Sequence, residues 1–127
     1  MSAASDVPAT DAFVVSNGEL AWRRRDIEQA VHAVRDSGRA ILGGEVWLIT
    51  GEHSWTGLIP QRGGGPLNVW SWTTDGRSAS ESWHDYCRRT AADSVDKLRA
   101  MPVEQDTPYE LIEKLRFNLT HVEEPKR

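Results

Sequence analysis

Cys87 and His84 are the first pair of residues that could do chemistry together, because they stand three positions apart in a segment with helical periodicity. A cysteine nucleophile needs a base within hydrogen-bond reach and an exposed thiol. Cys87 instead falls on the apolar stripe of its segment, which is typical of a small buried hydrophobe. The four histidines are scattered and the chain has a single cysteine, so the ligand spacing of a metal site is missing. We therefore expect neither a metal nor a cofactor.

Three carboxylates give a second possible chemistry. Glu45, Glu52 and Asp75 could supply a pair for glycoside hydrolysis, and Glu45 could also act with Glu52 or His53 in a small hydrolase. Nothing in their spacing makes these side chains converge, and surface carboxylates are the simpler interpretation. The run Gly63–Gly65 lacks the Lys-Ser/Thr pair of a phosphate-binding loop. We expect that the protein is not an enzyme.

Tryptophan is the unusual component of the chain, with 6 residues against 2 Tyr and 2 Phe. Trp70 and Trp72 are two positions apart on a predicted strand and so share one face, and Trp47 shares a face with Glu45 on another strand. Two arrangements remain open: the indoles form the core, or they lie on an exposed face. In the second case they would form a contact surface, because Trp is frequent at interface hot spots and aromatic surfaces also bind sugars and bases.

Two helices are predicted behind these strands. Ile27, Ala30, Val31 and Val34 are spaced as one helical face, which predicts a helix over about 24–37. Ser82 and Asp85 fit a capping box at the start of a second helix over 83–101, which Pro102 ends. Arg23-Arg24-Arg25 precedes the first helix. This triplet could contact phosphate or an acidic partner, or its solvated stems could cover Trp22.

Short apolar runs predict the sheet. Stretches 41–49, 55–59 and 67–74 are joined by turns, which favours an antiparallel meander, and alternation over 115–120 adds a C-terminal strand. A bulge or a close backbone approach is expected at Gly43-Gly44. The fold class is therefore α+β, with an antiparallel sheet of three to five strands and both helices packed on one face. A short helix over 107–114 would begin at a Thr107 cap.

Composition limits the classes of protein. At 127 residues and a net charge of −4, the chain reads as one domain over 12–123, with a disordered tail at 1–11 and a C-terminal tail at 124–127. The charge is not that of a basic nucleic-acid protein. Neither a signal peptide nor a transmembrane stretch is recognisable, so we expect a cytoplasmic protein without membrane or nucleic-acid partners. The oligomeric state stays open.

A family resemblance adds what these patterns leave open. The segment from Asn17 to Trp22, a short amphipathic helix, and then Ile41-Leu42-Gly43-Gly44-Glu45-Val46-Trp47 resemble the immunity protein 40 family of bacterial polymorphic toxin systems. Trp70-Ser71-Trp72 is similar to the family's aromatic strand, and Glu81-Ser82-Trp83-His84-Asp85-Tyr86 to its helix start. The chain departs in Gly18, in Trp47 where the family has Tyr, and in the 62–66 loop, and it matches least beyond Pro102.

The resemblance implies an α+β protein that neutralises a cognate toxin domain by stoichiometric binding, without catalysis. A small-molecule or carbohydrate-binding domain is the alternative that uses the same indoles. The residues of the family motif are expected to be structural: Asn17, Leu20, Ala21, Trp22, Ile41, Leu42, Gly43, Gly44, Glu81, Ser82, Trp83 and Tyr86. The candidate partner contacts are Glu45, Trp47, Trp70 and Trp72 on one sheet face, with Glu19 and Glu52 as an acidic rim. Glu45 has a structural alternative, in which it accepts backbone N–H groups near Gly43-Gly44.

Overall fold

The computed structural model describes residues 12–15 and 18–126. The predicted tail at 1–11 and Asn17 of the family motif lie outside these residues, as does Arg127. The strands are β1 (Phe13–Val14), β2 (Leu20–Trp22), β3 (Ala40–Ile49), β4 (Trp55–Thr56), β5 (Ser71–Thr73) and β6 (Leu115–Val122). The helices are α1 (Arg24–Asp36), α2 (Trp83–Ala100), α3 (Val103–Asp106) and a 3₁₀ helix, η2 (Tyr109–Lys114).

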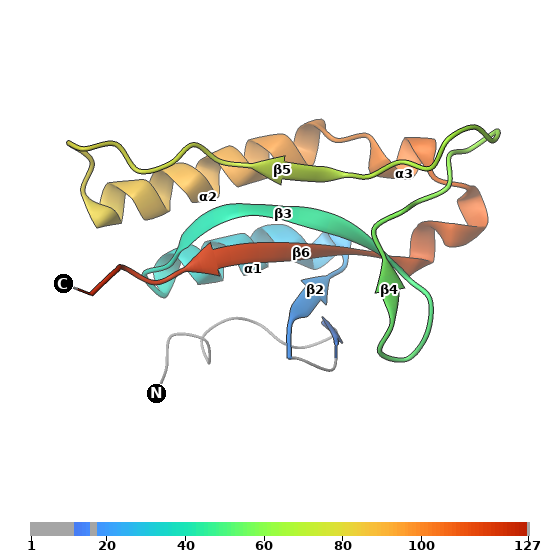
Figure 1. Cartoon of the computed structure of the whole chain (residues 1–127), viewed down its shortest axis with the longest axis horizontal. Helices are drawn as coiled ribbons and strands as arrows, with labels where there is room; N and C mark the ends of the chain where they lie inside the picture. Colours follow the sequence, from blue (N-terminus) through green and yellow to red (C-terminus); the bar gives the residue numbers. More distant parts are fainter. Residues whose placement is uncertain (1–11, 16–17, 127) are drawn as a thin grey trace.

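The α+β fold class is confirmed. All strand pairs are antiparallel, in the order β1-β2-β6-β3-β4, with β5 also paired to β3. Figure 1 shows α1 behind β3 and β6 and α2 behind β5, so that both long helices cover the same face of the sheet. Their inner stripes pack there against apolar residues of β3 and β6, in one core with Ile27, Val31, Val46, Leu98 and Phe117.

The strand pairing differs from a simple meander. β4 and β5 both pair with β3 on the edge opposite β6, β4 at Leu48–Ile49 and β5 at Gly43–Glu45. The chain between them, which we call the 57–70 loop, leaves this edge and returns to it. A single antiparallel bridge, Ile59 to Asn68, joins its two limbs. The stretches predicted over 55–59 and 67–74 are therefore shorter strands, because Pro60, Pro66 and the intervening glycines cannot continue a ladder.

The two glycines of β3 lie where the neighbouring chain comes close, as predicted. The register between β3 and β6 shifts between Ile41 and Gly43, which is the expected bulge. A Cβ atom on Gly43, at φ 153°, would lie 2.2 Å from the carbonyl oxygen of Trp72. A Cβ atom on Gly44 would lie 2.2 Å from the Trp72 ring and from the carbonyl oxygen of Asn118. Only glycine lets β5 and β6 approach β3 this closely.

The helices begin and end close to their predicted limits. All four residues of the predicted α1 stripe are buried. The Ser82 hydroxyl accepts a hydrogen bond from the Asp85 N–H at 3.0 Å, as the capping box requires. The predicted Thr107 cap is wrong: its hydroxyl donates to the Val103 carbonyl at 2.7 Å, and the segment that follows is the 3₁₀ helix η2. The Thr107 hydroxyl bonds back to α3 (Val103–Asp106), which directly precedes it, and so does not cap the segment that follows.

Arg24 joins the start of α1 to the end of α2. Its guanidinium donates to the carbonyls of Leu98 and Met101, forms a two-point contact with the Glu104 carboxylate and lies 4.4 Å from the centre of the Phe117 ring. These carbonyls belong to the last turn of α2 and its cap, where a cation is favourable. The middle arginine of the triplet thus has a structural role.

Candidate functional site

Trp72 belongs to the core on the helix side of the sheet. Its side chain is 6% exposed, and its indole N–H donates to the Ser94 hydroxyl of α2 at 3.1 Å. Trp70 points to the same side, as the alternation predicts, and packs partly buried against that core. The carbonyl of Trp70 accepts from the Val46 N–H at 2.9 Å, which holds the residue against β3. The core alternative for these two indoles is therefore the correct one.

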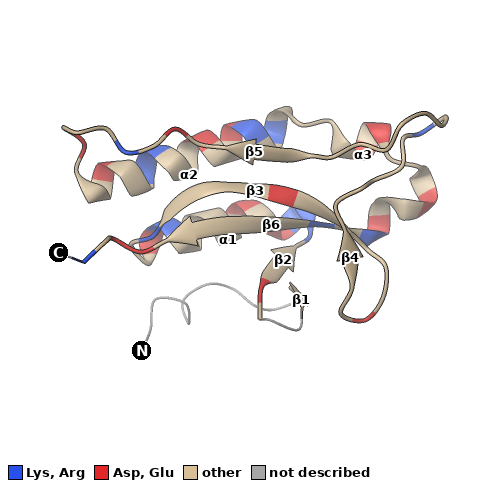
Figure 2. Cartoon of the chain, in the orientation of Figure 1, with Lys and Arg blue, Asp and Glu red and all other residues tan. Residues whose placement is uncertain are grey.

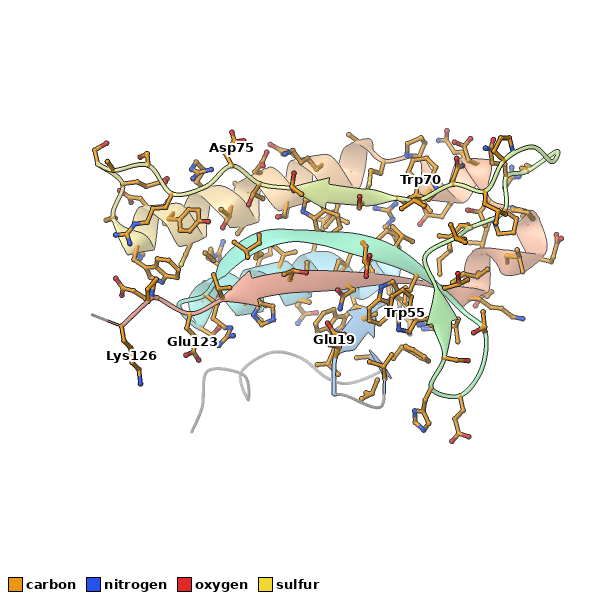
Figure 3. All side chains as sticks on the ribbon, in the orientation of Figure 1. Glu19, Trp55, Trp70, Asp75, Glu123 and Lys126 are labelled. Atoms are coloured by element: carbon orange, nitrogen blue, oxygen red, sulfur yellow. The ribbon has the colours of Figure 1, made fainter. Side chains whose placement is uncertain are left out.

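Trp47 lies on the opposite face of the sheet, so the expectation that it shares a face with Trp70 and Trp72 is wrong. It is 1% exposed because Trp55 stacks on it with ring centres 4.0 Å apart and Phe13 meets its edge at 6.4 Å. Figure 3 shows Trp55 on the side of β4 nearest β2. Val15 and Ala21 complete this second cluster. One half of the helix-free face is thus covered by aromatic side chains of β1 and β4.

Glu45 stands at the border between that covered half and an exposed polar half. Its carboxylate accepts the Trp47 indole N–H at 2.8 Å. The expected structural role, accepting backbone N–H groups near Gly43-Gly44, is not what the structure shows, because the indole two residues away is within easier reach. A carboxylate held by one hydrogen bond retains further lone pairs for a ligand.

The polar half of the face forms a shallow hollow above the two glycines. Its rim carries Glu45 of β3, Ser71 and Thr73 of β5, and Thr120 of β6. Ser71 lies directly across from Glu45 in the register, and the three hydroxyl-bearing residues are exposed. Sequence reasoning missed these hydroxyl residues. The signal that could have found them is their alternation with Trp70, Trp72 and Leu119 along the strands.

The two residues of the predicted acidic rim have different positions. Glu19 lines a neighbouring hollow with Asn118 and Thr120, so it borders the same polar half, and Figure 3 labels it beside β2. Glu52 lies in the turn after β3, where its side chain is 92% exposed and 3.9 Å from His53. Glu45 precedes the end of β3 by four residues, about 13 Å of strand. The structure therefore does not bring Glu45 together with Glu52 or His53.

The remaining described residues of the family motif are placed in the framework. Ala21, Trp22 and Ile41 are buried, while Leu20 and Leu42 are partly buried. At the start of α2 the Trp83 indole N–H donates to the Gly38 carbonyl at 2.8 Å, and Tyr86 is buried beside Cys87. Glu81 forms a two-point contact with Arg89, whose hydrogen bond lowers the pKa of the carboxyl to about 2.

Cys87, which was weighed as a nucleophile, lies in the core beside Tyr86. Burial raises the pKa of the Cys87 thiol, and the residue is only 3% exposed. Within residues 12–15 and 18–126, His, Cys, Asp and Glu side chains form no group of three that could hold a metal ion. None of the described helices is both long and apolar enough to span a membrane. Comparison of the chain with family models, curated proteins and solved structures gave no match.

Proposed function

We propose that this protein is a binding module that neutralises a bacterial toxin domain by stoichiometric contact in the cytoplasm, without a cofactor. Support comes from two independent sources. The segment from Asn17 to Met101 resembles the immunity protein 40 family. The sheet, for its part, has helices on one face and a polar hollow on the other. An antiparallel sheet covered on one side leaves its second face available for a partner.

The observation that carries the proposal is the position of Glu45. The Trp47 indole fixes the carboxylate at the edge of an aromatic cluster that is itself held by stacking with Trp55. A side chain fixed before binding loses less conformational entropy on association than a mobile one. The exposed hydroxyls of Ser71, Thr73 and Thr120 surround it and offer further hydrogen bonds.

Charge indicates what the partner presents to this face. Figure 2 shows an acidic band on β3, and Glu45 is the only Asp or Glu of that strand. Glu19 adds a second carboxylate near Thr120. Lysine, arginine or amide groups of a partner would complement these acids and speed association, as opposite charges do between proteins.

The carbohydrate-binding alternative has less support. A sugar ring needs the flat face of an exposed aromatic side chain. Trp47 and Trp72 are 1% and 6% exposed, so neither indole offers such a face. Trp70 is partly buried against the core, and Trp55 is stacked on Trp47. The surplus of tryptophan therefore stabilises the two sides of the sheet.

The decisive experiment begins with the gene immediately upstream of this chain's gene, where the proposal expects a large toxin, and then uses the C-terminal domain of that toxin. Coexpression of the wild-type chain is expected to restore growth to cells that produce this domain, and the purified proteins should form a 1:1 complex. Absence of both growth rescue and complex formation would overturn the proposed function.

Glu45→Gln tests the site. The amide oxygen can still accept the Trp47 N–H, so the free energy of unfolding should change little. Loss of a charge-assisted hydrogen bond to the partner should weaken the complex by about ten- to a hundredfold. Glu52→Gln is the matched control, because it removes a carboxylate from the exposed turn and should leave affinity unchanged. Equal affinities for wild type and Glu45→Gln would remove Glu45 from the interface.

A further inference from the structure

β5 has one edge that is not used by the sheet. The Trp70 carbonyl accepts from Val46, and the Thr74 N–H donates to Leu42 at 3.0 Å, so the even-numbered residues of this stretch face β3. Backbone groups alternate in direction along an antiparallel strand. The N–H and C=O groups of Ser71 and Thr73 therefore point away from β3, and both residues are exposed.

A groove runs between this edge and the end of α2. Its apolar wall is made by Trp72 of β5 together with Ala100, Met101 and Pro102, and this shallow groove is open to solvent, with a volume of about 380 Å³. Figure 1 shows β5 running alongside α2, in front of that helix. A strand edge beside a helix, with an apolar hollow between them, is the arrangement in which an extended peptide adds to a sheet and places alternate side chains in the hollow.

Lys97 is the charged residue of the groove. Its ammonium donates to the Thr73 carbonyl at 2.5 Å and pairs with Asp93 at 3.0 Å. Lysine at a sheet edge is a common protection against unwanted strand pairing. On this edge its ammonium bonds to the Thr73 carbonyl, and the described structure gives it no hydrogen bond to the backbone of Ser71.

We infer that the partner contributes an extended strand that pairs with β5 along this edge. The inference rests on the proposed function and adds how the toxin domain is held. Successive outward backbone groups of β5 are about 6.8 Å apart, a spacing that the backbone of another extended chain matches. An apolar side chain of that strand fills the hollow over Trp72 and Ala100, and an acidic residue pairs with Lys97.

The size of the polar half supports a contact that continues over the edge. Eight residues of strand measure about 27 Å and four strands span about 14 Å, which gives roughly 400 Å² for the whole helix-free face, so the polar half is smaller still. A stable protein complex buries about 800 Å² on each partner. Ser71 and Thr73 present side chains to the polar hollow and backbone groups to the β5 edge, so one partner can cover both.

Ser71→Pro tests the strand addition, with Ser71→Ala as the matched control. Proline removes the outward N–H but leaves the hydrogen bonds to β3, since those come from neighbouring residues. Both variants lose the side-chain hydroxyl that borders the polar hollow, so Ser71→Ala gives the reference affinity. Affinity for the toxin domain should be at least about tenfold lower in Ser71→Pro than in Ser71→Ala, because only proline also lacks the outward N–H. Thermal melting of both variants checks that the fold is retained. Equal affinities of the two folded variants would overturn the strand addition.

A second pair of variants keeps the test valid if Ser71→Pro fails to fold. Ala100→Trp fills the groove from an exposed helix position and should also weaken the complex at least tenfold. Ala92→Trp places the same side chain on an exposed position about 80° around α2 and should bind like wild type. Loss of affinity in neither or in both of these variants would count against the groove.

The outcomes separate the two proposals. If the wild-type chain forms no complex, the proposed function fails. Only the strand addition fails if the wild-type chain binds, Glu45→Gln weakens the complex, Ser71→Pro binds as well as Ser71→Ala, and Ala100→Trp binds like wild type. Light scattering of the isolated chain tests whether a second copy of the chain, in place of the toxin domain, occupies the β5 edge. A wild-type dimer that Ser71→Pro converts to a monomer would replace the toxin strand by the same edge of another molecule, which would overturn the inference.

Discussion

Replacement of Trp72 by alanine distinguishes a core indole from a contact residue. The side chain lies between β3 and α2 and is 6% exposed, so nearly all of its surface is removed from water. A buried Trp side chain removes about 150–250 Å² from solvent, worth roughly 4–6 kcal/mol at 25 cal/mol per Å². Measured losses for Trp→Ala in protein cores are about 3–5 kcal/mol. We expect the free energy of unfolding to fall by about 4 kcal/mol.

Urea denaturation followed by circular dichroism measures this loss. With a slope of about 2 kcal/mol per M for a domain of this size, the midpoint should fall by about 2 M. Folded Trp72→Ala protein should still form the complex through the polar hollow when conditions keep it native, with a weaker contribution from the β5 groove because Trp72 forms part of its wall. A midpoint unchanged within about 0.3 M, together with a weakened complex, would place the indole at the interface and refute the core assignment.

The hydrogen bond to Ser94 gives an internal control. Ser94→Ala leaves a buried indole N–H without an acceptor, at a cost of about 1–3 kcal/mol. Trp72→Phe removes the N–H itself. The double variant should therefore lose less than the sum of the single variants, because neither partner is then left unsatisfied. Strict additivity would show that the two groups do not interact.

Two further changes have outcomes fixed by the geometry. Gly44→Ala places a Cβ atom 2.2 Å from the Asn118 carbonyl oxygen, so it should lower the free energy of unfolding by about 1–3 kcal/mol, while Gly76→Ala, with open space around it, should not. For pH, the Arg89 hydrogen bond lowers the Glu81 pKa from 4.5 to about 2, so the stabilisation is present above pH 4.5 and is lost as pH falls toward 2. Urea midpoints between pH 5 and 2.5 should fall more steeply for wild type than for Glu81→Gln, and parallel curves would contradict this.

The helices and the core were predictable because their signals are local. The spacing of Ile27, Ala30, Val31 and Val34 and the capping pair Ser82–Asp85 act within a few residues. The Gly43-Gly44 bulge was also predictable, since two adjacent glycines in an apolar strand have few other roles. Each of these features depends on residues only a few positions apart, so it can be recognised from the sequence alone.

The candidate site was less predictable because it depends on which strands are adjacent. Alternation places Trp70 with Trp72, and Trp47 with Glu45, but it does not relate one pair to the other. That relation comes from the register that pairs Gly44 with Trp72 and Glu45 with Ser71, residues that are 28 and 26 positions apart in the sequence. The hydroxyl of Thr120 joins them only because β6 lies beside β3, a pairing that no local pattern specifies.

The position of β6 has a consequence for the order of folding during synthesis. Residues 115–122 form the strand between β2 and β3, so β2 and β3 have no shared neighbour until almost the whole described chain has been made. The hydrogen-bond partners of Arg24, which are Leu98, Met101 and Glu104, are likewise synthesised more than 70 residues after it. A nascent chain that ends before Leu115 would leave one edge of β2 and one edge of β3 unpaired. Unpaired strand edges promote aggregation. Under the proposed function, a nascent chain can therefore bind its partner only after β6 has been synthesised and has paired with β3, because Thr120 of β6 completes the polar hollow.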